Sequence, residues 1–331
     1  MQSQLLHKLA QLSARYGADP LLTQGAGGNT SIKDSKALII KASGKRLSQA
    51  LNEDIFVEMD QQRLLSAIGR GEEIDFNANL KGPLRGSIET PLHAVIPQTV
   101  VVHLHSVRTL AHAIRVNARQ ALEERLAGLP WALVPYAKPG WPLTWELQKT
   151  LAQSPSVWVL QNHGLIVAAD SCEGAEVLLD EVERRLERSP TNESSSPSSA
   201  LQSWVASHPE YRLPRENHAH TLAFCGETLD RLVQGVLCPD QAVFLGREVE
   251  VVNDLAELPA SPTAVATVVR QHGVLLKASA SQGSDDLVTC LGLLASRVEP
   301  SDKFSYLSEP QIEELLDWDA EKHRQALDRT R

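Results

Sequence analysis

Two histidines separated by one residue, His103 and His105, are the clearest candidates for metal chemistry in this chain. They end the segment TVVVHLHS (99–106), whose β-branched run predicts a strand. Side chains at positions i and i+2 of a strand point to the same face, so the two imidazoles can ligate one ion. The same pair arises by chance at strand ends, so two unrelated polar residues remain the alternative.

Two other polar residues could complete such a site. His163 lies in the bend Asn162-His163-Gly164 between two apolar segments that predict strands, as a third ligand or as a turn residue. Glu89 follows the capping-type Ser87 at an expected helix start near that serine. Its carboxylate could bind a metal or act as a general base, or could simply favour the positive end of the helix dipole.

Two loops rich in small residues, 25–31 and 42–45, each lie beside an expected strand. Glycine permits close backbone approach and positive φ, which an anion-binding loop requires. Neither loop matches G-x-G-x-x-G or a P-loop, so a nucleotide is not implied.

Helices and strands alternate along the chain, which favours a layered α/β fold. The Ser/Pro-rich segment 189–200 cannot bury a core and predicts a linker between domains 1–188 and 201–331. The second domain is expected to be a smaller α/β region. The remaining expected helices are 3–16, 107–128, 144–154, 173–188, 285–297 and one near the C-terminus, and residues 54–68 are expected to form a strand and a short helix. The remaining strands are 37–40, 131–135, two across 156–169, 242–245, 265–269 and 274–276.

Composition restricts the class of protein. The 331 residues are 42% hydrophobic and 22% charged, as in ordinary globular proteins, and the net charge of −9 disfavours nucleic-acid binding. There is no signal peptide and no apolar run of about 20 residues that could span a membrane, so we expect a cytoplasmic protein without a membrane partner. The four cysteines have no C-x-x-C spacing and predict neither disulfides nor a cysteine zinc site.

Six short motifs occur in an order that resembles the class II aldolase/adducin family, over residues 1–190. The wording of 87–94 and the tail beyond 237 are most similar to the aldolase half of bifunctional rhamnulose-phosphate aldolase/alcohol dehydrogenases. No Rossmann fingerprint is present, so we expect the aldolase portion alone. The motifs are Gly28-Asn29-Thr30-Ser31, Ala42-Ser43-Gly44, Ser87-Ile88-Glu89, His103-Leu104-His105, Pro135-Tyr136-Ala137 and Gln161-Asn162-His163-Gly164-Leu165-Ile166.

The resemblance implies a class II aldolase-like α/β/α fold and a Zn²⁺ or other divalent transition ion on His103, His105 and His163, with Glu89 as a displaceable fourth ligand. It implies an aldolase (lyase) that makes or breaks a carbon–carbon bond in a sugar phosphate or related hydroxy-carbonyl compound through a metal-stabilised enediolate. Glu89 and Tyr136 would be catalytic: Glu89, once displaced, could move the proton, because a carboxylate near an apolar helix end can have a raised pKa. The phosphate or other anionic end would contact Gly28, Asn29, Ser43, Gly44 and Ser87.

Two departures from the family pattern, Ile88 and Lys41-Ala42, fall at the phosphate loops. Alternatives on the same site are an epimerase, a dehydratase, a decarboxylase or a non-catalytic adducin-like protein. The resemblance also implies a closed homo-oligomer, with a tetramer favoured. His272, in a second QHG segment, is expected not to bind metal, and the segment containing His218 and His220 is expected to be a polar surface loop.

Overall fold

A seven-stranded mixed sheet forms the centre of the first of two compact units. The computed structural model describes residues 2–78, 80–191 and 195–329. The strand order is β3-β2-β1-β4-β7-β6-β5, so β4 is the central strand, and its five residues are all buried. This agrees with its apolar, β-branched sequence. The strands are β1 (Asn29–Lys33), β2 (Ala37–Lys41), β3 (Phe56–Asp60), β4 (Val100–Leu104), β5 (Trp131–Val134), β6 (Val157–Leu160) and β7 (Gly164–Ala169).

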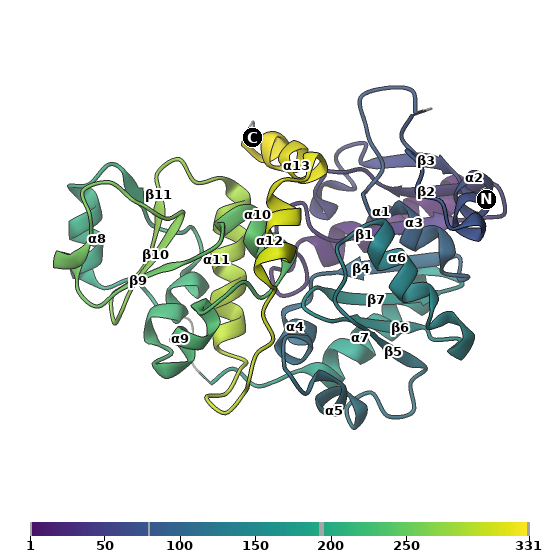
Figure 1. The fold of residues 1–331 in the computed structure, drawn as a ribbon. Coiled ribbons are helices and arrows are strands. Elements are labelled where there is room, and N and C mark those ends of the chain that lie inside the picture. Colours follow the sequence, from purple (N-terminus) through teal and green to yellow (C-terminus); the bar gives the residue numbers. More distant parts are fainter. Residues whose placement is uncertain (1, 79, 192–194, 330–331) are drawn as a thin grey trace. The chain divides into compact units, whose positions relative to one another are not determined.

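Helices cover both faces of this sheet (Figure 1). One layer contains α1 and α7, which contact each other and the central strands, and the other contains α2, α3 and α6. The first unit is therefore a three-layer α/β/α structure, which confirms the layered fold expected from the sequence. Its helices are α1 (Gln2–Gly17), α2 (Gln61–Arg70), α3 (Thr90–Val95), α5 (Ala118–Glu123), α6 (Trp141–Gln148) and α7 (Cys172–Leu186), with short 3-10 turns η1 (Leu47–Gln49) and η2 (Leu151–Gln153).

The continuous helix expected over 107–128 is wrong. The structure has α4 (Val107–Ala113) and α5, separated by a turn at 114–117. In that segment Arg115 forms an isolated bridge with Phe304, and the Val116 amide donates to the carbonyl of Lys303 at 2.9 Å. These bonds replace helical ones, and they explain why Leu110–Asn117 belongs to the second compact unit.

The second unit comprises Leu110–Asn117 and Glu187–Arg331 and contains a smaller sheet of the order β8-β11-β10-β9. The buried helix α11 lies against η3, and only a glycine at 292 permits the close approach, because a Cβ there would lie 1.9 Å from the His218 carbonyl oxygen. The elements are α8 (Ser199–Ala206), β8 (Tyr211–Arg212), η3 (Asn217–Phe224), α9 (Glu227–Val233), α10 (Pro239–Leu245), β9 (Glu250–Val252), η4 (Leu255–Glu257), β10 (Ala266–Val269), β11 (Gly273–Lys277), α11 (Gln282–Ala295), α12 (Glu309–Leu316) and α13 (Asp319–Arg329).

Two predictions for the second unit are wrong, the second only in part. The apolar run 242–245 is the end of α10 and not a strand: Pro239 occupies the first turn and Asp240 favours the helix N-terminus. The segment expected to be a polar surface loop, 207–220, is largely irregular up to 216 and His218 is exposed, but its last four residues belong to the 3-10 helix η3, in which His220 is 1% exposed. His220 Nδ1 accepts a hydrogen bond from the Val274 amide at 3.0 Å, which accounts for a histidine at a buried position.

The segment predicted as a linker, 189–200, is described except for 192–194, and that part of the prediction lies outside the described residues. The Thr191 amide donates to Ser296 and the Ser198 amide to His272, both at 2.8 Å. The helix α8 begins at Ser199. The boundary between the two domains at this segment stays a prediction.

Candidate metal centre

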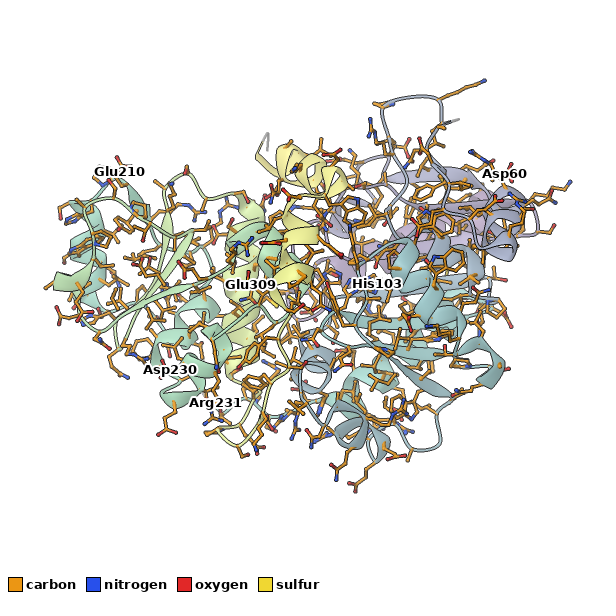
Figure 2. All side chains as sticks on the ribbon, viewed as in Figure 1. Asp60, His103, Glu210, Asp230, Arg231 and Glu309 are labelled. Carbon is orange, nitrogen blue, oxygen red and sulfur yellow. The ribbon has the colours of Figure 1, made fainter. Side chains whose placement is uncertain are left out.

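The first histidine of the H-x-H pair is fixed by the central strands of the sheet. His103, labelled in Figure 2, lies on β4 opposite Asn29 of β1 and Ile166 of β7. It is fully buried, and its Nδ1 lies 3.0 Å from the Leu165 carbonyl oxygen. A carbonyl only accepts, so Nδ1 carries the proton and the lone pair is on Nε2. The hydrogen bond from Nδ1 to the Leu165 carbonyl orients the ring so that Nε2 can ligate a metal, as in many metal sites.

His163 reaches the same place from the turn between β6 and β7. Asn162 adopts φ 55°, a left-handed conformation that asparagine tolerates better than most residues. Gly164 then passes so close to β4 that a Cβ would lie 2.4 Å from the Leu104 carbonyl oxygen and 3.3 Å from the Cα of His105. The N-H-G sequence is thus required to bring His163 beside the H-x-H pair.

The three imidazoles converge. The ring centroids of His103, His105 and His163 lie 4.9–5.1 Å apart, and one ligand atom from each lies within 4.8 Å of the others. Three nitrogen ligands with a further position left for a carboxylate, water or substrate are typical of catalytic zinc sites. The triad could therefore hold a divalent metal ion.

The carboxylate of Glu89 borders the triad. Its Oε2 lies 3.4 Å from His103 Nε2, and its Oε1 lies 3.6 Å from His163 Nε2. Asn29 Nδ2 donates to Oε2 at 2.7 Å, whereas Oε1 is buried and accepts no hydrogen bond from the described residues. A buried carboxylate oxygen without a hydrogen bond, facing three imidazoles, fits a metal ligand.

In the position that the structure shows, beside the imidazoles, the pKa of Glu89 is lowered, and the raised pKa expected for the displaced carboxylate stays a prediction. Burial by itself raises the pKa, but the imidazoles of His103 and His163 and the amide of Asn29 outweigh it and hold the pKa at about 2. The sequence showed the apolar helix end but not the imidazoles and the amide that face Glu89. The carboxylate is therefore charged at neutral pH, as a metal ligand must be.

Of the residues predicted to bind an anion, Asn29 lies beside the triad, because its side chain contacts Glu89. Asn29 Nδ2 also lies 3.2 Å from Ser87 Oγ, so this amide links the β1 loop to the start of α3. Gly28 has φ 64°, and a Cβ there would lie 2.8 Å from the His103 carbonyl oxygen, so this glycine is needed for close packing on β4. Anion binding by Gly28, Asn29 and Ser87 stays a prediction. An anion on the Asn29 or Ser87 side chain would compete with the hydrogen bonds that Asn29 makes to Ser87 and Glu89.

The second loop lies beside the chain leading to Ser87. The Ser43 amide donates to the Arg85 carbonyl at 2.8 Å, and Gly44 has φ 74°. Lys41 is 2% exposed, and its Nζ donates to the carbonyls of Ala26 and Lys45, both at 2.7 Å. One buried ammonium thus joins the two small-residue loops, a role that we did not predict from sequence.

Tyr136 follows β5 at the sheet end where β6 turns toward His163. The Gln161 amide donates to the Val134 carbonyl at 3.0 Å, which ties the two strand ends together. Tyr136 is partly buried there. Its catalytic role stays a prediction.

Behind Glu89 lies a buried polar group that the sequence reasoning missed. His93 is fully buried one helical turn after Glu89, its Nδ1 lies 2.7 Å from Ser31 Oγ, and its carbonyl accepts from Lys33 Nζ at 2.8 Å. Burial lowers the pKa of Lys33 to about 7 and that of His93 well below its ordinary value. Polar residues at 29, 31 and 33 share one face of β1, and this alternation was the available signal.

The sequence profile of the class II aldolase and adducin N-terminal domain matches residues 7–189. The match covers more than half of the chain, which therefore belongs to this family. Among the described residues, no helix has both the length and the apolar character needed to cross a membrane.

Individual relatives are distant. A Bacillus subtilis (strain 168) protein named uncharacterized oxidoreductase YuxG is 26% identical over 187 residues, which is 51% of this chain and 27% of that protein. The chain thus spans about a quarter of that relative. The solved N-terminal class II aldolase domain of a conserved protein from Thermoplasma acidophilum is 24% identical over 54% of this chain and 90% of its own, with a TM-score of 0.48. The l-fuculose-1-phosphate aldolase of Thermus thermophilus is 16% identical over 56% of this chain and 93% of its own, with a TM-score of 0.41.

Proposed function

We propose that this protein is a metal-dependent lyase that cleaves or forms a carbon–carbon bond in a sugar phosphate or related hydroxy-carbonyl compound. The observation that carries the proposal is the convergence of three imidazoles with the buried, charged Glu89 carboxylate. A fold without catalysis has no physical need for this costly set of desolvated groups. The rhamnulose-phosphate type of substrate belongs to the same proposal and follows from sequence resemblance.

The bound ion, zinc in our proposal, would polarise the substrate carbonyl and stabilise the negative charge left when the carbon–carbon bond breaks. The Nδ1–H group of His103 donates a hydrogen bond to the Leu165 carbonyl, so Nε2 stays available to the metal. Glu89 is held by Asn29 on one oxygen only, so the other oxygen can exchange partners when a substrate enters. Once displaced from the imidazoles, which lower its pKa, the carboxylate becomes basic enough to accept a proton.

The anionic end of the substrate would bind the two small-residue loops. Lys41 holds these loops together through the carbonyls of Ala26 and Lys45. Ser43 and Gly44 would present backbone donors, as anion-binding loops do. Tyr136 would protonate the leaving aldehyde, and a closed homo-oligomer, a tetramer in our proposal, would complete the site.

A screen of ketose 1-phosphates for aldehyde release, coupled to an aldehyde-reducing dehydrogenase, tests the proposal. The metal-loaded protein should release aldehyde from at least one ketose phosphate, and Glu89→Gln should reduce the rate by about 10²-fold or more. Release of water or carbon dioxide, or inversion at one carbon, in place of aldehyde would replace the lyase by a dehydratase, decarboxylase or epimerase. A metal-loaded protein inactive toward all these compounds would favour the adducin-like alternative.

A further inference from the structure

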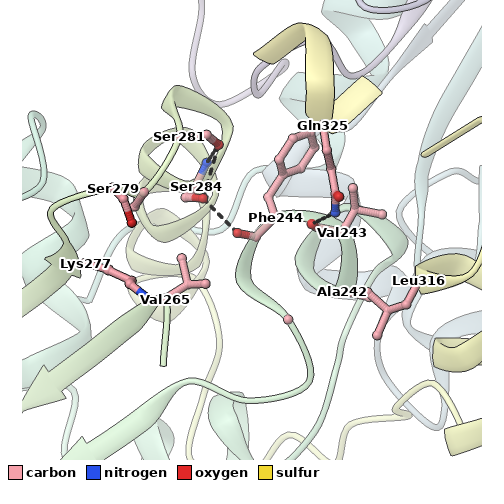
Figure 3. A pocket seen from close by; sticks show the side chains of 12 residues that line it. Ala242, Val243, Phe244, Val265, Lys277, Ser279, Ser281, Ser284, Leu316 and Gln325 are labelled. Carbon is pink, nitrogen blue, oxygen red and sulfur yellow. Dashed lines mark hydrogen bonds between the residues drawn. The ribbon is translucent and has the colours of Figure 1, made fainter. Parts of the chain in front are cut away.

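A cavity of about 550 Å³ lies entirely within the second unit, and none of the groups proposed for the metal centre lines it. Figure 3 shows it between the end of α10, the residues that follow β11 and the start of α11, with α12 and α13 contributing one residue each. Cavities that bind small molecules have volumes of roughly 300–1,000 Å³. The space therefore has the size of a metabolite site.

The charge of the lining is opposite to that of the chain. Acidic residues outnumber lysines and arginines by 41 to 32 in the whole sequence, yet the described residues that line the cavity include no acidic side chain and one lysine, Lys277. The Lys277 ammonium forms no hydrogen bond or ion pair with any described residue. Lys277 is exposed at the rim of the cavity, so its ammonium group is available to an anion that enters from solvent.

Hydroxyl groups extend this polar wall. Ser284 Oγ donates to the Phe244 carbonyl at 2.8 Å, and Ser281 Oγ accepts from the Ser284 amide at 3.2 Å, so both hydroxyls are fixed by the fold. The amide of Gly283 is likewise used, because it donates to Asp328 at 2.7 Å. The Ser279 hydroxyl has no partner among the described residues and lies two residues beyond Lys277. Lys277 and Ser279 are therefore the donors left for a ligand.

The lining on the α10 side is largely apolar, and its one polar side chain, Gln325, donates to the Val243 carbonyl. In Figure 3 Ala242, Val243 and Leu316 lie on the α10 side of the cavity, with Phe244 between them and the side that carries Lys277 and Ser279. A bare inorganic ion would gain nothing from such a wall, whereas a carbon skeleton would be removed from water there. The two walls together match a molecule with one charged and one apolar end.

We infer that this cavity binds a small organic anion, with its carboxylate or phosphate group on Lys277 and Ser279 and its carbon skeleton against the apolar wall. The inference is independent of the proposed lyase activity, because it uses only residues of the second unit. Carboxylate and phosphate oxygens both accept hydrogen bonds from an ammonium and a hydroxyl, so the two ligand classes are separated by experiment.

The test is calorimetric titration of the full chain with glycerol 3-phosphate, lactate and inorganic phosphate, with neutral glycerol as a blank. We expect one organic anion to bind with a dissociation constant in the millimolar range or below, and Lys277→Gln to weaken it by about tenfold or more. Ser279→Trp, which fills the cavity from its exposed rim, should abolish binding. Lys303→Gln removes an exposed lysine of the same unit that does not line the cavity and should change nothing.

The same titration of His103→Ala separates this cavity from the metal centre, since binding at the cavity should persist in that variant. The inference is overturned if no organic anion binds at 10 mM, a concentration corresponding to roughly 3 kcal/mol of affinity. It is also overturned if inorganic phosphate binds as well as the organic anions, if Lys277→Gln binds like the wild type, or if binding disappears in His103→Ala while the fold persists.

Discussion

Replacing Gly164 by alanine tests how closely the metal centre depends on the approach of β7 to β4. The added Cβ would lie 2.4 Å from the Leu104 carbonyl oxygen, where an ordinary contact begins at 3.4 Å, so the strands must separate by about 1 Å. Overpacking of this kind costs about 1–3 kcal/mol of unfolding free energy. Since His163 precedes the glycine, its ring moves with the strand, and zinc affinity should fall by about 10–100-fold, as when a supporting contact of a metal ligand is lost.

Both quantities are measurable on one preparation. Urea denaturation gives the unfolding free energy, and competition with a chromophoric chelator gives the zinc affinity. The control is Gly69→Ala in α2, where an added Cβ meets no atom within 4 Å, and which should be neutral or more stable by up to about 1 kcal/mol. A Gly164→Ala protein with wild-type stability and wild-type zinc affinity would refute the reasoning.

Three other substitutions have defined outcomes. Asn29→Ala removes the amide that holds the Glu89 carboxylate, so zinc affinity should fall by about tenfold in the chelator assay; unchanged affinity would count against this support. Lys41→Met leaves two loop carbonyls without their donor and should cost about 1–3 kcal/mol in urea denaturation; a loss below 0.5 kcal/mol, roughly that of a surface change, would contradict it. Burial raises the pKa of Glu183 from 4.5 to about 7 against the opposing effects of Ser106 and Arg108. The folded state therefore binds the extra proton, and stability falls as the pH rises from 4.5 to 7. Glu183→Gln should flatten that part of the stability profile, and an unchanged slope would exclude Glu183 as its source.

The sequence predicted the central strand from its local pattern, whereas local patterns marked the three histidines as candidates and the family resemblance joined them into one ligand set. A β-branched run fixes β4, i and i+2 spacing places His103 and His105 on one side, and N-H-G marks the turn of His163. Membership of the family, shown by the profile match, agrees with the order of the motifs. The residues that support the ligands were harder to find, because Lys41 and His93 are defined by partners distant in sequence.

Tertiary contacts also explain the incorrect elements. Short apolar runs such as 242–245 fit a strand or a buried helix equally well, and Pro239 with Asp240 was the signal that decided for the helix. The break after Ala113 depends on pairing between Arg115 and Phe304, which local propensity does not contain. The pKa of Glu89 similarly depends on imidazoles that come from β4 and the β6–β7 turn.

The measurement that tests the central claim most directly is the metal content of four purified proteins: wild type, His103→Ala, His163→Ala and His272→Asn. His272 is the matched control, because its Nδ1 lies 2.9 Å from Ser198 Oγ in the second unit and we predict no metal role for it. Elemental analysis after dialysis against zinc-buffered solution should give about one ion per chain for the wild type and for His272→Asn, since a three-histidine site holds one ion. The other two variants should lose most of the metal while circular dichroism shows an unchanged fold. Full occupancy in both His103→Ala and His163→Ala would contradict the assignment of the metal centre.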